Sequence, residues 1–209
     1  MKGWPPSGDV HEYDPASDRW QRLAALPTTR GALAAAVLDG KIHAAGGIGW
    51  RGRNTAAHEV YDPAANRWTA LAYIPTARDH LAAAAIDGRL YAVGGRIDGN
   101  CSRNLSSNEA YDLATDRWEQ RAPMPTARSG IATAVLEGRM FVFGGEAPAG
   151  TFNQVQAYDG RSNGWSSHAR MPTARHGLGA AAVAGRIYVI SGGPRPGDSA
   201  SAANEIFVP

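Results

Sequence analysis

Residues 75–95 read PTARDHLAAAAIDGRLYAVGG: a Pro-x-x-Arg segment, an apolar run of small residues, an Asp-Gly pair, a second apolar run and a Gly-Gly pair. The same succession recurs at 27–47, 125–145 and 172–193. A second recurring segment lies between the copies, as in EVYDPAANRW at 59–68 and EAYDLATDRW at 109–118. Self-similarity at a period of about fifty residues predicts a repeat architecture.

Each repeat predicts four short antiparallel strands. The first is the small-residue run, such as Leu81–Ile86, and the second is Leu90–Val93 and its equivalents. The two residues between these runs indicate a type I′ hairpin, because both central positions of that turn need positive φ. These turn pairs are Asp39-Gly40, Asp87-Gly88, Glu137-Gly138 and Ala184-Gly185. The third strand ends near a Tyr and the fourth begins near a Trp seven residues later, in the pairs Tyr13 and Trp20, Tyr61 and Trp68, Tyr111 and Trp118, and Tyr158 and Trp165.

The alanine-rich run also fits a helix, because alanine is the best helix former. A Pro-x-x-Arg segment and a hairpin turn bound the run and leave about eight residues, which is short for a helix. Helices alternating with strands would make a parallel sheet, and two-residue turns cannot connect parallel strands. Small side chains suit strands that crowd around one axis, so the run is predicted to be the innermost strand of each repeat.

Four antiparallel strands per repeat, arranged radially, make a β-propeller blade. The Gly-Gly pair, followed by Tyr and then by Trp seven residues on, resembles the kelch repeat from about residue 9 to residue 208. The sequence also resembles bacterial multi-kelch proteins of unassigned activity, within the superfamily that contains galactose-oxidase-like propellers. The resemblance implies an all-β kelch propeller of about four blades, each with four antiparallel strands.

We name the strands of a blade A to D, from the innermost to the outermost. The repeat divides a single domain, 1–209, into strands C and D at 1–26, full blades at 27–74, 75–124 and 125–171, and strands A to C at 172–209. Either the C-terminal A and B strands pair with the N-terminal C and D strands, leaving the last C strand surplus, or the chain is an N-terminally truncated five- or six-bladed ring. We expect truncation, because Met1 falls within a B–C loop.

Composition limits the classes of function. The 209 residues are 44% hydrophobic, which argues against disorder, and the net charge of +2 is too small for a typical nucleic-acid binder. The sequence has no apolar run long enough for a membrane span, and the first residues lack the apolar core of a signal peptide. Cys101 is the single cysteine, so it cannot form an internal disulfide, and the compartment stays open.

The alternation of strand direction predicts which loops share a face. The D–A and B–C connections lie on one face of a propeller, and the A–B and C–D turns lie on the other. The short turns are nearly identical in every copy, whereas the B–C loops at 47–58, 95–108, 145–154 and 193–204 all differ. Variable loops on a rigid scaffold usually carry binding, so we expect ligands on the D–A/B–C face.

The Arg of each Pro-x-x-Arg segment lies at a D–A corner, at Arg30, Arg78, Arg128 and Arg175. One interpretation is a ring of guanidinium groups that receives an acidic peptide or a carboxylate. The other is structural: each Arg ties one blade to the next through backbone carbonyls or a neighbouring Glu. We favour the structural role, because the Arg recurs with the fold. The candidate Glu partners are Glu59, Glu109 and Glu205, and Gln156 replaces Glu in one copy.

Residues that differ between copies are better candidates for specific contacts. Beside the corner Arg these are Asp79, His80, Ser129 and His176, although they fit solvated loop residues equally well. The first B–C loop adds Trp50 and Arg51, and a Trp flanked by Arg can stack on a sugar or anchor a protein partner.

Catalytic motifs are absent from the sequence. It has no phosphate loop, no Cys/His cluster and no nucleophile elbow, so no cofactor or metal is expected. We therefore predict a non-enzymatic binding module for a protein segment or a glycan, with self-association through open blade edges as a further possibility. The alternative is a carbohydrate-active enzyme that resembles either the kelch-type sialic-acid mutarotases or the copper radical oxidases, although the motif of neither matches position by position.

Overall fold

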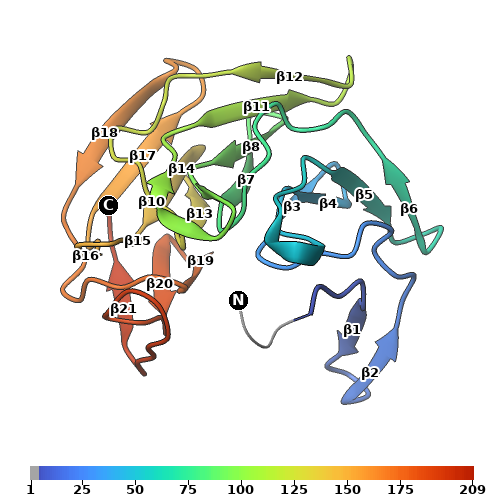
Figure 1. Cartoon of the computed structure of the whole chain (residues 1–209), viewed down its shortest axis with the longest axis horizontal. Helices are drawn as coiled ribbons and strands as arrows, with labels where there is room; N and C mark the ends of the chain where they lie inside the picture. The colour runs from blue at the N-terminus through green and yellow to red at the C-terminus, as the bar shows by residue number, and fades with distance from the viewer. Residues whose placement is uncertain (1–4) are drawn as a thin grey trace.

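The computed structural model describes residues 5–209 and contains strands with a single short 3-10 turn. Antiparallel sheets are arranged around a common centre, as in a propeller (Figure 1). Three sheets are complete four-stranded blades: blade 1 is β3 (Ala34–Leu38), β4 (Lys41–Ala45), β5 (His58–Asp62) and β6 (Arg67–Ala70); blade 2 is β7 (Ala82–Ile86), β8 (Arg89–Val93), β11 (Asn108–Asp112) and β12 (Arg117–Gln120); blade 3 is β13 (Ala132–Leu136), β14 (Arg139–Phe143), β17 (Val155–Asp159) and β18 (Gly164–His168).

Two smaller sheets begin and end the described part of the chain. The N-terminal hairpin is β1 (His11–Asp14) with β2 (Arg19–Arg22), and blade 4 has three strands, β19 (Gly179–Val183), β20 (Arg186–Ile190) and β21 (Asn204–Phe207). The B–C loops carry small elements that the sequence analysis did not predict: η1 (Trp50–Gly52), the hairpin β9 (Arg96–Ile97) with β10 (Asn100–Asn104), and the hairpin β15 (Glu146–Ala147) with β16 (Gly150–Thr151).

The alanine-rich runs are strands and not helices, as predicted. In blade 2 the run pairs residue by residue with β8, from Ala82 opposite Val93 to Ile86 opposite Arg89. The intervening Asp87 and Gly88 both have positive φ, 49° and 73°, as a type I′ turn requires. Because successive strands of each blade are antiparallel, the D–A and B–C connections lie together on one face.

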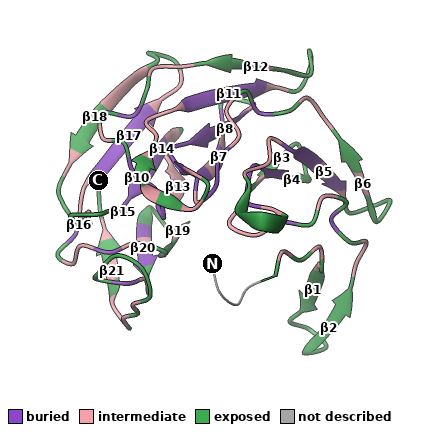
Figure 2. Ribbon diagram, in the orientation of Figure 1, coloured by how far each residue is buried: buried purple, intermediate pink, exposed green. Residues whose placement is uncertain are grey.

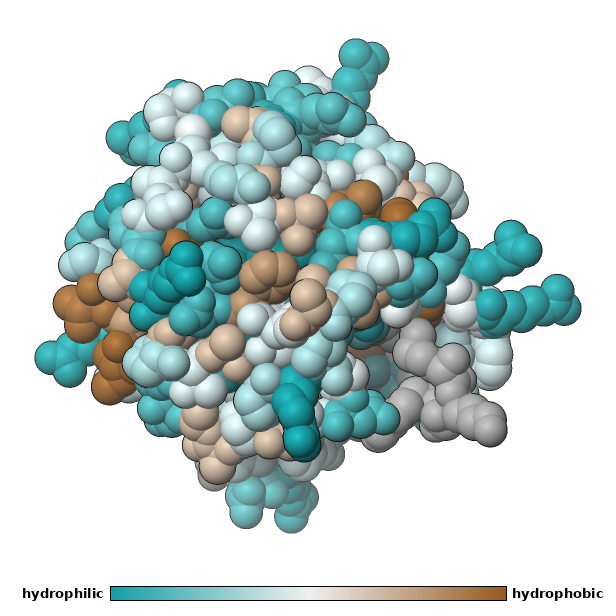
Figure 3. All heavy atoms as spheres, turned by 60° about the vertical axis from the view of Figure 1, so that its left-hand side comes forward, coloured by the Kyte–Doolittle hydropathy of each residue, from teal (hydrophilic) through white to brown (hydrophobic). Residues whose placement is uncertain are grey.

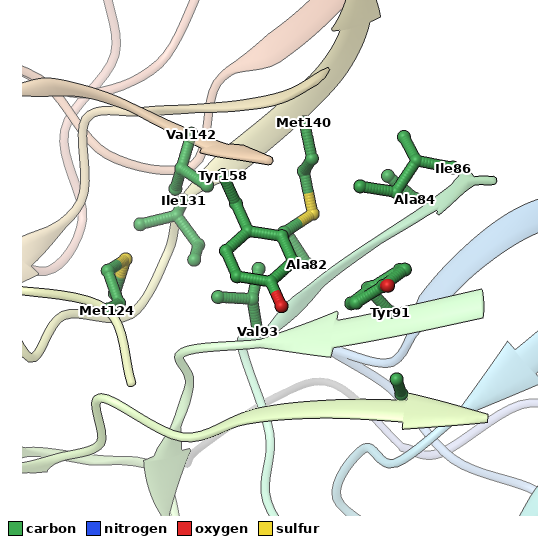
Figure 4. Packing of buried hydrophobic residues seen from close by; sticks show 11 residues of the cluster. Ala82, Ala84, Ile86, Tyr91, Val93, Met124, Ile131, Met140, Val142 and Tyr158 are labelled. Carbon is green, nitrogen blue, oxygen red and sulfur yellow. The ribbon is translucent and has the colours of Figure 1, made fainter. Parts of the chain in front are cut away.

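The core lies between adjacent blades. Figure 4 shows one cluster, in which Tyr91 and Val93 of blade 2 pack against Met140, Val142 and Tyr158 of blade 3. The two middle strands of each complete blade are mostly buried, the innermost strands are partly buried, and the outermost strands contain no buried residue (Figure 2). The hydrophobic effect therefore holds each blade against its neighbours, and blades 2 and 3 have a neighbour on each side.

Each Gly-Gly pair allows a close contact between one blade and the next. The amide of Gly47 donates a hydrogen bond to the carbonyl of Arg78 over 2.8 Å, and the amide of Gly95 donates to that of Arg128 over 3.0 Å. A Cβ atom at Gly46 would lie 2.7 Å from the Arg78 carbonyl oxygen, so a side chain at this position would separate the blades. The Gly-Gly pair recurs because the backbones of successive repeats approach each other there.

The first of the two interpretations of the chain ends is wrong. It requires β20 to pair with the N-terminal hairpin, but β20 pairs with β21, with Ile187 opposite Phe207. The hairpin forms a separate two-stranded sheet, and every residue of β1 and β2 is exposed (Figure 2). In Figure 1 the hairpin and β21 lie on opposite sides of an opening in the ring.

Candidate functional site

The four corner arginines are buried inside the blades. The side chains of Arg30, Arg78 and Arg175 have no exposed surface, and Arg128 is also fully buried. In blade 2, the Arg78 guanidinium donates to the carbonyl oxygens of Thr76 and Ala92 and lies 2.5 Å from a carboxylate oxygen of Glu109. These groups therefore do not form a ligand-accessible ring, and the geometry fits the structural role.

The bonds of these side chains stay within one blade. Arg30 pairs with Glu59, and Arg175 pairs with Glu205, so Glu is the partner that the sequence suggested. The links to the preceding blade come from the backbone carbonyls of the arginines, which accept the Gly amides described above. The side chain stiffens its own blade, and the backbone of the same residue joins two blades.

Arg128 is the exception, because its blade has Gln156 where the other blades have Glu. The guanidinium donates to the Gln156 side-chain oxygen over 3.1 Å and to the Val142 carbonyl over 3.3 Å. Burial without a carboxylate partner lowers the pKa of Arg128 to about 10. Blade 3 therefore carries a buried cation with no adjacent counter-ion.

Replacing Gln156 with Glu is expected to stabilise the protein. The change supplies the missing counter-ion with little change in side-chain size, and charge-assisted hydrogen bonds are stronger than neutral ones. We expect a gain of about 1 kcal/mol, or roughly 2–4 °C in Tm. Thermal unfolding of Gln156→Glu beside Gln154→Glu, the same charge change two residues earlier and just outside β17, measures it. Equal effects of the two changes, or a loss from the first, would contradict this account of Arg128.

Five charged or titratable side chains form a continuous network on the D–A/B–C face. His80 Nδ1 lies 2.5 Å from Asp79, whose carboxylate accepts from Arg96 Nε over 3.3 Å. The other end of the Arg96 guanidinium donates to Glu146 over 2.6 Å, and His176 Nδ1 lies 3.4 Å from the same carboxylate oxygen. The network thus runs from the corner of blade 2 to the corner of blade 4 and alternates acidic and basic groups.

The two carboxylates at the centre of this network are held ionised. Burial raises the pKa of Asp79, but the hydrogen bonds from His80, Asn54 and the Gly99 amide outweigh burial, and the pKa lies below its ordinary value. The pKa of Glu146 is lowered in the same way: burial raises it, but the hydrogen bonds from the Gly197 amide and Arg96 outweigh burial. The two anions therefore fix the positions of the basic groups beside them.

His80 has an unusual backbone conformation. Its φ is 50°, in the left-handed region, where the equivalent positions of blades 3 and 4 are Gly130 and Gly177. Its amide donates to the Ala32 carbonyl and its carbonyl accepts the Gly130 amide, both over 2.9 Å, so hydrogen bonds to neighbouring blades maintain the strain. Ala32 of blade 1 has the same φ of 50°, so the conformation belongs to the corner of every repeat, and it is the imidazole that distinguishes His80. The side chain is 27% exposed and is therefore available to a ligand.

A pocket of about 820 Å³ lies beside His80 on the same face. The η1 turn supplies Trp50, which is 65% exposed, and Arg51, which has a positive φ of 63°. The corner at Gly31 and Ala32 and the segment before β1 complete the lining. The pocket thus brings together residues that the sequence analysis placed in two separate connections: Trp50 and Arg51 in the first B–C loop, and His80 at the D–A corner of blade 2.

Arg30 also lines this pocket, although its side chain is buried, whereas the other predicted residues are not part of the lining. His176 joins the far end of the network, and its Nε2 atom lies 3.1 Å from the Arg195 carbonyl. Ser129 is fully buried, and its hydroxyl has no hydrogen-bond partner among the described residues. Neither residue lines the pocket, so their roles in binding stay a prediction.

Sequence reasoning missed Arg96 and Glu146, which connect the network. Both follow a Gly-Gly pair directly, at positions where blade 1 has Ile48. Each forms a β-bridge with the corner residue of its own repeat, Arg96 with Asp79 and Glu146 with Ser129. The signal was a charged residue that appears after Gly-Gly in only two copies.

The described residues contain no group of three or more His, Cys, Asp and Glu side chains placed to hold a metal ion. In residues 5–209, no helix has the length and apolar character needed to span a membrane. What the face offers is a partly exposed imidazole, an exposed indole and an exposed guanidinium around one pocket, supported by buried ion pairs.

A family model described as the KLHDC2/KLHL20/DRC7 Kelch-repeats domain matches residues 73–208. The match covers more than half of the 209 residues and includes blades 2, 3 and 4. No curated protein shows significant similarity to the chain.

Proposed function

This chain belongs to the kelch-repeat family, and on that premise we propose that it is a non-enzymatic module that binds an acidic protein segment in the pocket beside His80. Kelch propellers generally mediate protein binding. The segment would lie on the D–A/B–C face, with its side chains against the η1 turn and the corner of blade 2.

The charge of the pocket lining is the observation that carries this proposal. The lining includes Arg51 and His80, and none of the described residues that line it is an Asp or a Glu. The Asp79 carboxylate lies behind His80, buried and already hydrogen-bonded to four groups, so it orients the imidazole rather than facing the pocket. A planar guanidinium suits carboxylates, and an exposed Trp supplies apolar contact area at low entropic cost.

Rigidity also supports a binding role. The backbone of His80 is tied to the blades on both sides, and its side chain is tied to the buried ion-pair network. A pre-organised surface loses little conformational entropy when a ligand binds. Among residues 5–209 the Trp50 indole forms no hydrogen bond, and it is 65% exposed, so this side chain can adjust to the ligand.

Acid–base chemistry on a sugar is a second candidate function, and one observation favours it. His80 Nδ1 contacts a buried carboxylate, and this arrangement orients an imidazole for proton transfer at its other nitrogen. Glycan binding without catalysis would use the same pocket, because an exposed indole can stack on a sugar ring. Incubation with free reducing sugars, followed by NMR of their anomeric signals, separates catalysis from simple binding.

Replacing Trp50 or Arg51 with Ala is expected to weaken binding of an acidic peptide about tenfold in each case. The first change removes the exposed apolar contact, and the second removes the accessible cation. The probe is a fluorescein-labelled peptide of alternating Glu and Leu, compared with the same peptide carrying Lys for Glu. Fluorescence anisotropy at low and high salt measures both affinity and its electrostatic part.

His80→Gly is the sharpest variant, because glycine adopts the left-handed φ without strain. The fold should keep its stability while the imidazole is lost, so weaker peptide binding would report on the side chain alone. Arg161→Ala, which removes an exposed cation distant from the pocket lining, is the matched control. The proposal would be refuted if Arg161→Ala weakened binding of the Glu peptide as much as Arg51→Ala does. Equal affinity for the Lys peptide and the Glu peptide would also refute it.

A further inference from the structure

The outer edge of β21 is an unfilled strand position. In each complete blade, strand C pairs with strand B on one side and with strand D on the other. β21 is the C strand of blade 4, because Phe207 lies opposite Ile187 just as Tyr111 lies opposite Leu90 in blade 2. Among the described residues, β21 pairs only with β20. Free strand edges are templates for pairing with another strand.

Strand D does more than complete the sheet. In blade 2 the Trp118 indole donates to the carbonyl of Ala72, in the connection that precedes the blade, over 2.9 Å. The Asp116 side chain accepts the amide of the same Ala72 over 2.9 Å. Blades 1 and 3 repeat both bonds: Trp68 and Asn66 bind Ala24, and Trp165 and Asn163 bind Ala122. In each complete blade, a Trp and the Asn or Asp two residues before it therefore bind the carbonyl and the amide of one alanine in the connection that precedes the blade.

Blade 4 has the alanine but not the strand that grips it. Ala24, Ala72 and Ala122 each lie three residues before the Pro of the Pro-x-x-Arg segment, and Ala169 has the same place before Pro172. Ala169 is exposed, and neither its amide nor its carbonyl has a hydrogen-bond partner among residues 5–209. The site for a D strand, with its donor and its acceptor, is thus already formed.

The N-terminal hairpin carries a strand that fits this site. Asp18 lies two residues before Trp20, the spacing found in all three complete blades. Trp20 is 69% exposed, and no hydrogen bond is formed by its indole in the described part of the chain. The hairpin is a two-stranded sheet with every strand residue exposed, and such hairpins are marginally stable alone. The side-chain contacts that hold β2 include Trp20 and Asp18 with Tyr13, and an exposed ion pair of Arg22 with Asp9. Exposed ion pairs contribute little, and a D-strand site would replace the aromatic contact.

We propose that β2 of a second copy of this chain adds to the free edge of β21 and completes blade 4. The register of the complete blades places Trp20 opposite Phe207 and Arg22 opposite Glu205. This gives an aromatic pair and sets a second cation beside a carboxylate that already pairs with Arg175. The Trp20 indole donates to the Ala169 carbonyl, and the Asp18 carboxylate accepts the Ala169 amide. This contact is independent of the pocket beside His80.

The surface around the site supports a partner. Ile206 and Val208 are 52% and 64% exposed beside the free edge, and Val183 and Ile190 are exposed on the same sheet. The side of the molecule that carries β18 and β21 is otherwise largely hydrophilic, with apolar groups exposed only in small patches (Figure 3). An added strand would cover part of this apolar surface. Because donor and acceptor surfaces differ, association is head-to-tail and forms closed dimers or longer assemblies.

A peptide tests the site without changing the fold. The probe is a fluorescein-labelled peptide of residues 15–24, PASDRWQRLA, and the receptor is the full chain with Trp20→Ala, which removes competition from its own copies. We expect saturable binding by anisotropy, weakened at least about tenfold by Trp20→Ala in the peptide and more modestly by Arg22→Glu, which opposes Glu205 with a like charge. Absence of binding, or equal binding of the Trp20→Ala peptide, would overturn the proposal.

The intact chain gives the second readout. Light scattering over a concentration series should show mass above the monomer for the unchanged chain, a shift to monomer for Trp20→Ala, and no shift for Trp50→Ala. Trp50 is a matched control, because it is 65% exposed and lies in η1, away from both strands. A monomeric mass for the unchanged chain would contradict a contact between copies. If Trp20 fluorescence also showed a buried indole in that monomer, β2 would be completing blade 4 of its own chain.

Discussion

Replacing Arg78 with methionine is expected to destabilise the protein by about 3–5 kcal/mol. The change leaves the Glu109 carboxylate buried without a counter-ion, and that carboxylate is 1% exposed. It also leaves the carbonyl oxygens of Thr76 and Ala92 without the donor that they have now. Burial lowers the pKa of Arg78, and Glu109 opposes that shift, so the carboxylate stabilises the charged form of Arg78.

Arg128→Met is the matched control, because Arg128 has the same place in blade 3 but bonds to the amide oxygen of Gln156. Its loss leaves unpaired carbonyl and amide oxygens but no buried charge. We therefore expect Arg128→Met to cost clearly less than Arg78→Met. Urea unfolding at pH 7 measures both free energies, and the double variant Arg78→Met/Glu109→Leu should recover much of the loss. Equal costs at the two positions would show that carbonyl bonding, and not ion pairing, sets the contribution of the corner arginine.

The repeat made the fold predictable from sequence. Turn pairs such as Asp87-Gly88 and aromatic pairs such as Tyr111 and Trp118 act locally or within one blade, and each recurs in several copies. Because repetition separates residues that serve the fold from residues that vary, it also favoured the structural role of Arg78. The buried Arg78–Glu109 pair fits that interpretation.

The site was only partly predictable, because it depends on which corners meet. Asp79 and His80 were candidates as neighbours in sequence, but Arg96 became visible only when the β-bridge placed it against Asp79. Glu146 lies fifty residues farther along the chain, in blade 3, and contacts Arg96 of the adjacent blade 2. No periodic pattern encodes such a contact, since each member occurs once.

The state of the chain ends was also beyond sequence reasoning. The repeat predicted an A, B and C strand at the C-terminus and a C and D strand at the N-terminus, and both sets are present. Two C strands, β1 and β21, are alternatives for the edge of β20, and composition does not rank them. Phe207 explains the outcome in the structure: it packs with Phe141 and Phe143 of blade 3, whereas Tyr13 contacts only Trp20 among the aromatic residues.

Acid is expected to destabilise the protein through a histidine pair at the interface of blades 1 and 2. His43 is 1% exposed and His58 is fully buried, and His43 Nδ1 lies 2.9 Å from His58 Nε2. The His58 ring also packs against Tyr111 and Trp118 of blade 2. With His58 Nδ1 donating to the Ala72 carbonyl, its Nε2 accepts from His43, so both rings are neutral and every nitrogen in the contact has one role.

Protonation of His58 breaks this arrangement, because a second donor would face His43 Nδ1–H. Burial lowers the pKa of His58 to about 4, with a further contribution from His43, and the hydrogen bond to the Ala72 carbonyl opposes this shift. Burial also lowers the pKa of His43, with a contribution from Lys41. In the unfolded chain both histidines titrate near pH 6.5. Below that pH the unfolded state binds protons that the folded state does not, so stability falls as the pH falls.

The expected loss attributable to His58 is about 2 kcal/mol between pH 7 and pH 5, and it levels off below about pH 4, where the folded state also binds the proton. His58→Asn should remove this part of the pH dependence. Asn108 has the equivalent position in blade 2 and donates to the Ala122 carbonyl over 3.1 Å, so an Asn at 58 can keep the bond to Ala72. His11→Asn, a change on the exposed N-terminal hairpin, controls for the loss of any histidine.

Urea unfolding at pH 7 and pH 5 measures the effect as a difference between proteins, which cancels the contribution of all other titrating groups. The unchanged chain and His11→Asn should lose about 2 kcal/mol more than His58→Asn over this range. The histidine pair belongs to blade 1 alone among the complete blades. The residues at the two positions are Tyr91 and Asn108 in blade 2 and Phe141 and Val155 in blade 3. If His58→Asn kept the full acid sensitivity, the weak point at low pH would lie outside this interface, and the buried carboxylates of the corner ion pairs would be the next groups to replace.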